Sequence, residues 1–152
     1  MKETDYHKSI LVNGNRRQAF EALTTSYGSW WTKPDRPIHQ VGDQARFSFP
    51  PGKSFWTFRA TELISDERVT LTCVEALHLH DALSETIREE WLGTQLHWSI
   101  KDHGAQTQIE LLHQGLNPKL ECFNVCEAGW NFFFLDSLKA YLDTGQGKPH
   151  RE

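Results

Sequence analysis

Residues 113–149 decide the fold of this chain and read HQGLNPKLECFNVCEAGWNFFFLDSLKAYLDTGQGKP. An apolar strand ends at His113, and a turn that contains Gly115 and Pro118 follows it. A long helix is predicted next, with an apolar face formed by Trp130, Phe133, Phe134, Leu138 and Tyr141. Gly145 is expected to end this helix. The pattern indicates a sheet wrapped around one helix, with a cavity between the two.

The sequence before this stretch alternates between apolar and polar residues, which is typical of strands with one covered and one exposed face. Strands are predicted at 6–12, 45–49, 56–61, 69–73, 96–101 and 109–113. Residues 102–104 are expected to form the turn between the last two. Residues 75–93 are less regular and predict a long loop with a strand edge near Trp91. In the strands, Arg46 and Arg59 fall in the polar phase and are expected to face solvent.

Two helices are predicted between the first strand and the other five strands, and the long helix follows the last strand. Asn15 and Gln18 form a capping-box pattern that predicts the start of a helix. Residues 24–32 predict a second short helix or a turn. Because helices and strands are segregated along the chain, the predicted fold class is α+β. The length of 152 residues, with no internal linker, predicts one domain over 1–152.

Composition and charge argue against several classes of function. The formal net charge is −4 with no basic run, which argues against nucleic-acid binding. No apolar stretch approaches the roughly 20 residues that a membrane span needs, and the N-terminus lacks the apolar core of a signal peptide. Cys73, Cys122 and Cys126 are predicted to be free thiols. We therefore expect a cytoplasmic protein.

The order of these elements resembles the START-like (SRPBCC) superfamily and its helix-grip fold. More narrowly, the chain is similar to the family related to the C-terminal domain of activators of heat-shock protein 90 ATPase. The matching positions cover nearly the whole chain and are Trp30-Trp31, Gly42, Phe47, 57–63, 68–71, 90–94, 113–116, Gly129-Trp130 and Ser137-Leu138. The resemblance implies a curved antiparallel sheet that grips the long C-terminal helix.

The resemblance also implies a range of functions. Most members of the superfamily bind hydrophobic small molecules in the cavity, some are cyclases or dehydratases, and some are co-chaperones of the stress response. Fold-level analogy does not choose among these functions.

The cavity is the first candidate site. Bulky aromatic residues build thick cores or line pockets for flat, apolar ligands, and the chain has 6 Trp and 9 Phe. The alternative is a filled core made of the same side chains. The predicted ligand-binding residues are Trp31, Phe47, Phe49, Trp56, Phe58, Leu71, Trp98, Leu111, His113, Trp130 and Phe134.

His113 is the most informative polar residue in this set. It falls in the inward phase of its strand, so a neutral imidazole there could orient a ligand or move a proton. The alternative is a buried histidine whose hydrogen bonds are satisfied within the fold.

Cys122 and Cys126 are four residues apart, and His78 and His80 form a second pair. Neither pair predicts a metal site, so no metal and no cofactor are expected.

Three hypotheses follow. The first is a binding protein for a lipophilic or aromatic small molecule. The second is a co-chaperone-like protein that binds a chaperone or another protein partner through its surface. The third is a cyclase or dehydratase that uses His113 as acid and base, although no catalytic motif is present. Exposed edge strands make a homodimer conceivable.

Overall fold

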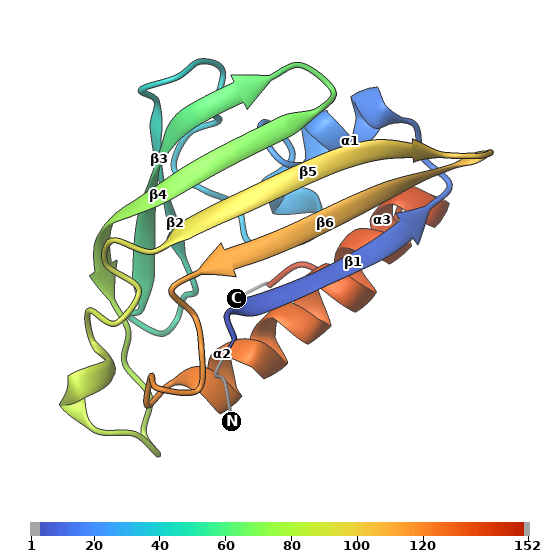
Figure 1. The fold of residues 1–152 in the computed structure, drawn as a ribbon. Helices are drawn as coiled ribbons and strands as arrows, with labels where there is room; N and C mark the ends of the chain where they lie inside the picture. The colour runs from blue at the N-terminus through green and yellow to red at the C-terminus, as the bar shows by residue number, and fades with distance from the viewer. Residues whose placement is uncertain (1–3, 151–152) are drawn as a thin grey trace.

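The computed structural model describes residues 4–150 and contains one curved antiparallel sheet of six strands. The strand order is β1-β6-β5-β4-β3-β2, so only the β1–β6 pair joins strands that are distant in the sequence. Figure 1 shows the C-terminal helix lying along one face of this sheet. The strands are β1 (Tyr6–Val12), β2 (Gln44–Ser48), β3 (Phe55–Ile64), β4 (Arg68–Leu77), β5 (Gln95–His103) and β6 (Gln106–Gln114). This arrangement confirms the predicted α+β helix-grip fold.

The buried face of the sheet follows the predicted alternation. Along β6, the buried residues are Thr107, Ile109, Leu111 and His113, and the residues between them are partly exposed. Side chains on alternate positions of a strand point to the same face, so the inward set packs against the helix. Arg46 and Arg59 are exposed, as expected.

The C-terminal helix is continuous from residue 123 to residue 144 but is not uniform. It consists of α2 (Phe123–Trp130), a π-helical stretch η3 (Asn131–Leu138) and α3 (Lys139–Thr144). Trp130, Phe134 and Leu138 are buried and are spaced four residues apart. A π-helix has more residues per turn than an α-helix, so this spacing keeps the three on one face. Gly145 ends the helix in the left-handed conformation (φ 87°), as predicted.

Short helices occupy the connections. The helix α1 (Arg16–Ala22) and the 3₁₀ helix η1 (Tyr27–Ser29) follow β1, and the 3₁₀ helix η2 (Glu85–Ile87) lies in the loop after β4. The predicted strand edge near Trp91 is wrong, because that segment forms turns in which the Trp91 carbonyl accepts from the Thr94 N–H. The predicted turn at 102–104 is also displaced. The β5–β6 turn is formed by Gly104 and Ala105, so His103 still pairs with Gln106.

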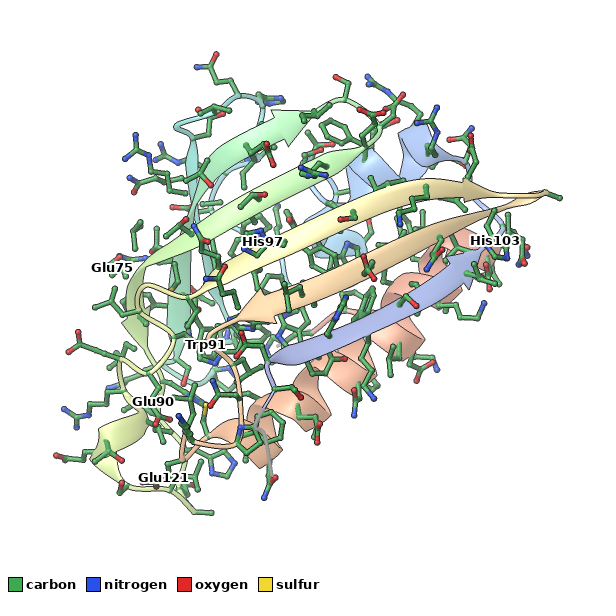
Figure 2. The ribbon with its side chains drawn as sticks, in the orientation of Figure 1. Glu75, Glu90, Trp91, His97, His103 and Glu121 are labelled. Atoms are coloured by element: carbon green, nitrogen blue, oxygen red, sulfur yellow. The ribbon has the colours of Figure 1, made fainter. Side chains whose placement is uncertain are left out.

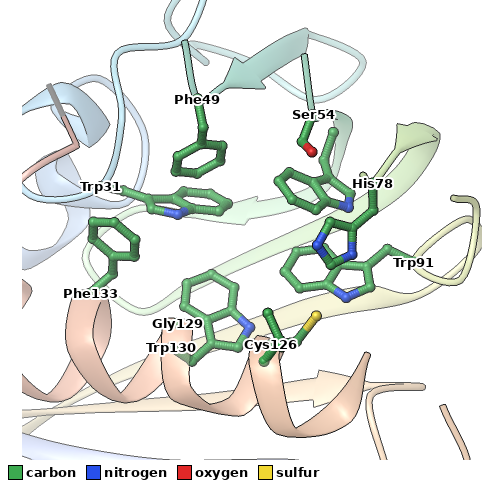
Figure 3. A pocket seen from close by; sticks show the side chains of 11 residues that line it. Trp31, Phe49, Ser54, His78, Trp91, Cys126, Gly129, Trp130 and Phe133 are labelled. Atoms are coloured by element: carbon green, nitrogen blue, oxygen red, sulfur yellow. The ribbon is translucent and has the colours of Figure 1, made fainter. Parts of the chain in front are cut away.

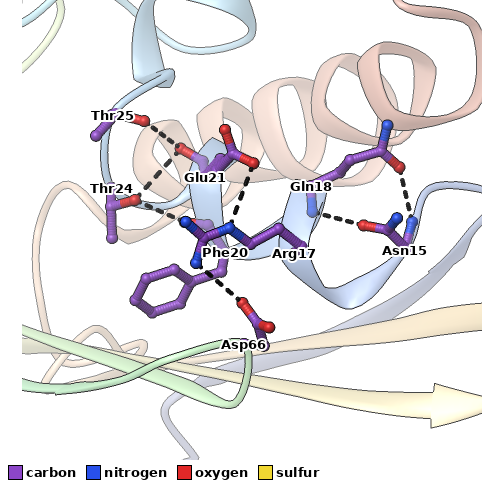
Figure 4. Close-up of polar contacts among 8 residues, drawn as sticks. All are labelled: Asn15, Arg17, Gln18, Phe20, Glu21, Thr24, Thr25 and Asp66. Atoms are coloured by element: carbon purple, nitrogen blue, oxygen red, sulfur yellow. Dashed lines mark hydrogen bonds and ion pairs between the residues drawn. The ribbon is translucent and has the colours of Figure 1, made fainter.

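The start of α1 is fixed by the predicted capping box. The Asn15 side chain accepts from the Gln18 N–H at 2.8 Å, and the Gln18 side chain accepts from the Asn15 N–H at 2.8 Å (Figure 4). Both bonds satisfy N–H groups that a helix leaves free at its first turn. Nearby, Arg17 lies between Glu21 and Asp66.

Replacing Asn15 with Ala is expected to lower the free energy of unfolding by about 1 kcal/mol, because a cap acceptor is lost. Urea unfolding of the purified variant measures this change. The matched control is Asn15→Ser, which keeps an acceptor oxygen and should stay close to the wild type. A variant Asn15→Ala as stable as the wild type would contradict the role of the cap.

Within residues 4–150, no helix combines the length and the apolar character needed to cross a membrane.

Candidate functional site

A pocket of about 240 Å³ opens at one end of the interface between the sheet and the C-terminal helix. Its walls come from the segment after η1, from the β2–β3 hairpin, from the loop after β4 and from α2 with the start of η3 (Figure 3). The lining residues are Trp31, Phe49, Ser54, Trp56, His78, Trp91, Val125, Cys126, Gly129, Trp130 and Phe133.

Aromatic rings form most of the wall. Trp91 and Trp130 lie nearly parallel, with ring centroids 6.0 Å apart and an angle of 11° between the planes. The ring centroids of Trp31 and Trp130 are 5.0 Å apart, and those of Trp56 and Trp91 are 4.9 Å apart. Flat, rigid rings of this kind present a large apolar area at low entropic cost, which suits a flat apolar molecule.

Three polar atoms of the lining residues are buried without a hydrogen-bond partner among the described residues. They are the indole Nε1 of Trp56, the indole Nε1 of Trp91 and the imidazole Nδ1 of His78. These atoms are themselves buried, so they lie behind the exposed surface of the pocket wall. The pocket is therefore apolar on its faces, with polar atoms in its lining residues.

His113 lies behind the pocket rather than in its wall. Its Nδ1 accepts from the Trp130 indole N–H at 3.0 Å, and its Nε2 is 2.9 Å from the Thr94 hydroxyl. That hydroxyl donates its own hydrogen to the Trp91 carbonyl at 2.7 Å, so Nε2 is the nitrogen of His113 that carries the proton. Both ring nitrogens of this neutral histidine are therefore engaged.

The environment of His113 also opposes an acid–base role. The side chain is fully buried, and burial lowers the pKa of His113 to about 3, with a smaller contribution from His97. A group that holds its charge only far below neutral pH does not accept protons efficiently near pH 7. His113 instead holds Trp91 and Trp130 in position, since its ring also meets the Trp91 ring edge to face at 4.5 Å.

The structure divides the eleven residues predicted for ligand binding into two groups. Four of them line the pocket: Trp31, Phe49, Trp56 and Trp130. The other seven lie in the core, each with 0% of its surface exposed: Phe47, Phe58, Leu71, Trp98, Leu111, His113 and Phe134. Most of the inner face is thus a filled core, and contact with a ligand stays a prediction for the whole set.

Seven lining residues were missed by the sequence reasoning. Val125, Gly129 and Phe133 are spaced four apart on the C-terminal helix, and this spacing could have placed them beside Cys126 and Trp130. Ser54, His78 and Trp91 come from a turn and from an irregular loop, where no periodicity reports on side-chain direction.

A cluster of nitrogen and sulfur atoms borders the pocket. His78, Cys122 and Cys126 each offer one atom, and these atoms all lie within 4.8 Å of one another. The Cys126 thiol donates to Cys122 Sγ at 2.9 Å. This donor lowers the pKa of Cys122 to about 6, and the same contact together with burial raises the pKa of Cys126.

Two carboxylates fix the loop after β4 against the start of the C-terminal helix. Glu121 accepts from the Ser84 N–H, the Ser84 hydroxyl and the Thr86 hydroxyl, all at 2.6 Å. These donors lower the pKa of Glu121 to about 2. Glu90 accepts from the backbone N–H groups of Glu121 and Cys122 at 3.0 Å. Figure 2 shows Glu90, Trp91 and Glu121 together, at the end of the sheet away from His103.

Comparisons with known proteins agree with the fold. A family model described as "Activator of Hsp90 ATPase homolog 1-like protein" matches residues 13–143. No curated protein matches the chain.

Several solved structures share the architecture. The structure of the Aha1 dimer from Colwellia psychrerythraea is 24% identical with a TM-score of 0.73, and the match covers 97% of this chain and 100% of that one. CV1439 from Chromobacterium violaceum is 13% identical with a TM-score of 0.72, covering 92% and 98%. DynU16, from the dynemicin biosynthetic locus, is 17% identical with a TM-score of 0.69, covering 97% and 49%. At these identities the similarity shows the fold alone.

Proposed function

Because this chain belongs to the activator of Hsp90 ATPase homolog 1-like family, we propose that it uses the helix-grip fold to bind a small, flat, mainly apolar molecule. The observation that carries this proposal is the pocket itself, whose walls are mainly aromatic rings. A ligand with one or two aromatic rings matches the flat walls.

The pocket is preorganised by the core behind it. Trp130 is held by Trp31, Trp91 and His113, so the wall is in place before a ligand enters. A site whose side chains are already ordered loses less entropy on binding than one that must be assembled.

Gly129 provides a variant that fills the pocket without removing a contact. A Cβ added at this position meets nothing within 4 Å, and its helical neighbours Val125, Cys126 and Phe133 all line the pocket. Replacing Gly129 with Leu is therefore expected to place four carbons in the space proposed for the ligand.

We expect the wild type to bind the fluorescent probe 1-anilinonaphthalene-8-sulfonate at one saturable site, and Gly129→Leu to weaken this binding at least about tenfold, which corresponds to ~1.4 kcal/mol. Fluorescence titration measures the affinity. The control is Gly129→Ala, which should keep binding and gain about 0.5–1 kcal/mol in stability, since Ala replaces Gly in a helix. No saturable binding by the wild type, or equal binding by Gly129→Leu, would refute the proposal.

The family match also supports a second candidate, a co-chaperone-like role. In this account the chain binds an Hsp90-type chaperone through its exposed surface and changes its ATPase rate. A steady-state ATPase assay with and without the purified chain tests it, and an unchanged rate together with no complex on gel filtration counts against it.

The Colwellia relative is described as a dimer, so sedimentation of this chain alone would also test whether its edge strands β1 and β2 pair copies.

A further inference from the structure

Three side chains that are distant in the sequence meet beside the pocket. His78 directly follows β4, Cys122 precedes the first residue of α2, and Cys126 lies one helical turn further on. Their imidazole and thiol atoms all lie within 4.8 Å of one another, and all three residues are buried. One nitrogen and two sulfurs at such separations are a donor set typical of thiophilic metal ions.

The histidine of this cluster is buried and is not fully hydrogen-bonded. Only 6% of the surface of His78 is exposed, and its Nδ1 has no hydrogen-bond partner within residues 4–150. A buried polar atom without a partner costs free energy, which a bound ion or ligand atom would recover. The ring is also held in place, with its centroid 5.1 Å from that of Trp56.

The surroundings fix the relative positions of the three side chains. The backbone N–H of His78 donates to the backbone carbonyl of Arg88 at 2.9 Å. This bond holds His78 within its loop. Glu90 accepts from the Cys122 N–H, and Glu121 binds Ser84 and Thr86, so this loop is attached to the start of α2 by several bonds. These bonds keep the backbone of the three residues in place.

We propose that His78, Cys122 and Cys126 bind one Zn²⁺ ion, with both cysteines as thiolates. Two thiolates balance the charge of the ion, so the buried site as a whole is neutral. Three protein ligands leave a fourth tetrahedral position, which is characteristic of open rather than purely structural zinc sites. His78 and Cys126 also line the pocket, so water or a ligand atom from the pocket completes the coordination. The site does not depend on the proposed small-molecule ligand.

Binding requires a small rearrangement of the sulfurs. They are 2.9 Å apart in a thiol–thiol hydrogen bond, whereas two Zn–S bonds of about 2.3 Å at a tetrahedral angle place them roughly 3.8 Å apart. Loss of the Cys126 thiol proton removes that hydrogen bond, and rotation about the side-chain bonds then separates the sulfurs. Zinc binding therefore releases protons.

The test uses the reduced, metal-free protein. Zn²⁺ is titrated in competition with a chromophoric chelator, and Co²⁺ is titrated as a spectroscopic substitute. We expect one equivalent of either ion to bind, and the Co²⁺ form to show the thiolate charge-transfer absorption and visible bands of tetrahedral coordination. Absence of this absorption in the reduced wild type would overturn the proposal.

Variants assign the ligands. Cys122→Ser, Cys126→Ser and His78→Ala should each weaken Zn²⁺ binding by about 100-fold or more, since even second-shell changes cost 10- to 100-fold. The matched controls are His80→Ala, which removes an exposed histidine of the same loop, and Cys73→Ala, which removes the buried cysteine outside the cluster; neither should change the affinity. Equal losses in controls and ligand variants would contradict the assignment.

A measurement on the wild type covers the case in which a variant does not fold. Alkylation followed by peptide mass spectrometry should show that one equivalent of Zn²⁺ protects Cys122 and Cys126 from modification. The result that opposes the site is a Cys122–Cys126 disulfide that forms equally with and without Zn²⁺, because the same two sulfurs would then serve as a redox pair.

Discussion

Lowering the pH from 7.5 to 5.0 is expected to reduce the free energy of unfolding by about 2 kcal/mol through His113 alone. The pKa of His113 is about 3 in the folded protein, against 6.5 for an ordinary histidine. Between these values the unfolded chain binds a proton that the folded protein excludes. The stability that neutral His113 provides is therefore fully present above pH 6.5. It is lost progressively as the pH falls toward 3.

The physical cause is burial. His113 is enclosed by Trp91, Thr94 and Trp130, its Nε2 already carries a proton, and its Nδ1 accepts from the Trp130 N–H. A second proton would have to go on Nδ1, which would break the bond to Trp130 and place a charge in an apolar core.

Urea unfolding at pH 7.5 and 5.0 measures the effect on the wild type and on His113→Gln. The amide oxygen of this glutamine can still accept from the Trp130 N–H, and its charge does not change with pH. The wild type should lose about 2 kcal/mol more than this variant over that interval. His103→Gln is the matched control, because His103 is an exposed histidine at the end of β5. If the wild type and His113→Gln show the same pH dependence, His113 is not held neutral by the fold.

Replacing Trp130 with Ala is expected to cost about 3–5 kcal/mol of stability, which is the usual range for a buried Trp. Only 2% of its surface is exposed, and its ring contacts those of Trp31, Trp91 and Trp98. Its indole N–H also donates to Nδ1 of His113. The variant therefore leaves both a cavity and an unpaired Nδ1 on His113.

Chemical denaturation of Trp130→Ala measures this loss. The control is Phe132→Ala on the same helix, where 44% of the side chain is exposed and the expected change is within about 0.5 kcal/mol. A loss below about 1 kcal/mol for Trp130→Ala would show that the aromatic cluster is not the centre of the fold.

Local patterns in the sequence predicted most of the fold. Alternation placed the strands, the Asn15–Gln18 pair placed the start of α1, and Gly145 placed the end of the long helix, because each of these signals acts within a few residues. The π-helical stretch was not predicted, since residues spaced four apart fit an α-helix almost as well.

The site was predicted only in part, because alternation reports which face a side chain occupies and not how far along the strand it sits. Phe47 and Phe49 have the same phase in the sequence, yet Phe47 lies in β2 and is fully buried in the core, while Phe49 lies just past the end of β2, is partly exposed and lines the pocket. The approach of His78 to Cys122 and Cys126 depends on the path of a long irregular loop, which no local pattern specifies.

The claim that the aromatic pocket holds a small apolar molecule is tested most directly by mass spectrometry of the organic extract from protein purified gently out of cells. Wild type and Gly129→Leu are extracted in parallel. We expect a lipophilic compound in about one copy per chain in the wild type and much less in the variant. An empty wild-type extract, or equal amounts in both proteins, would contradict the account.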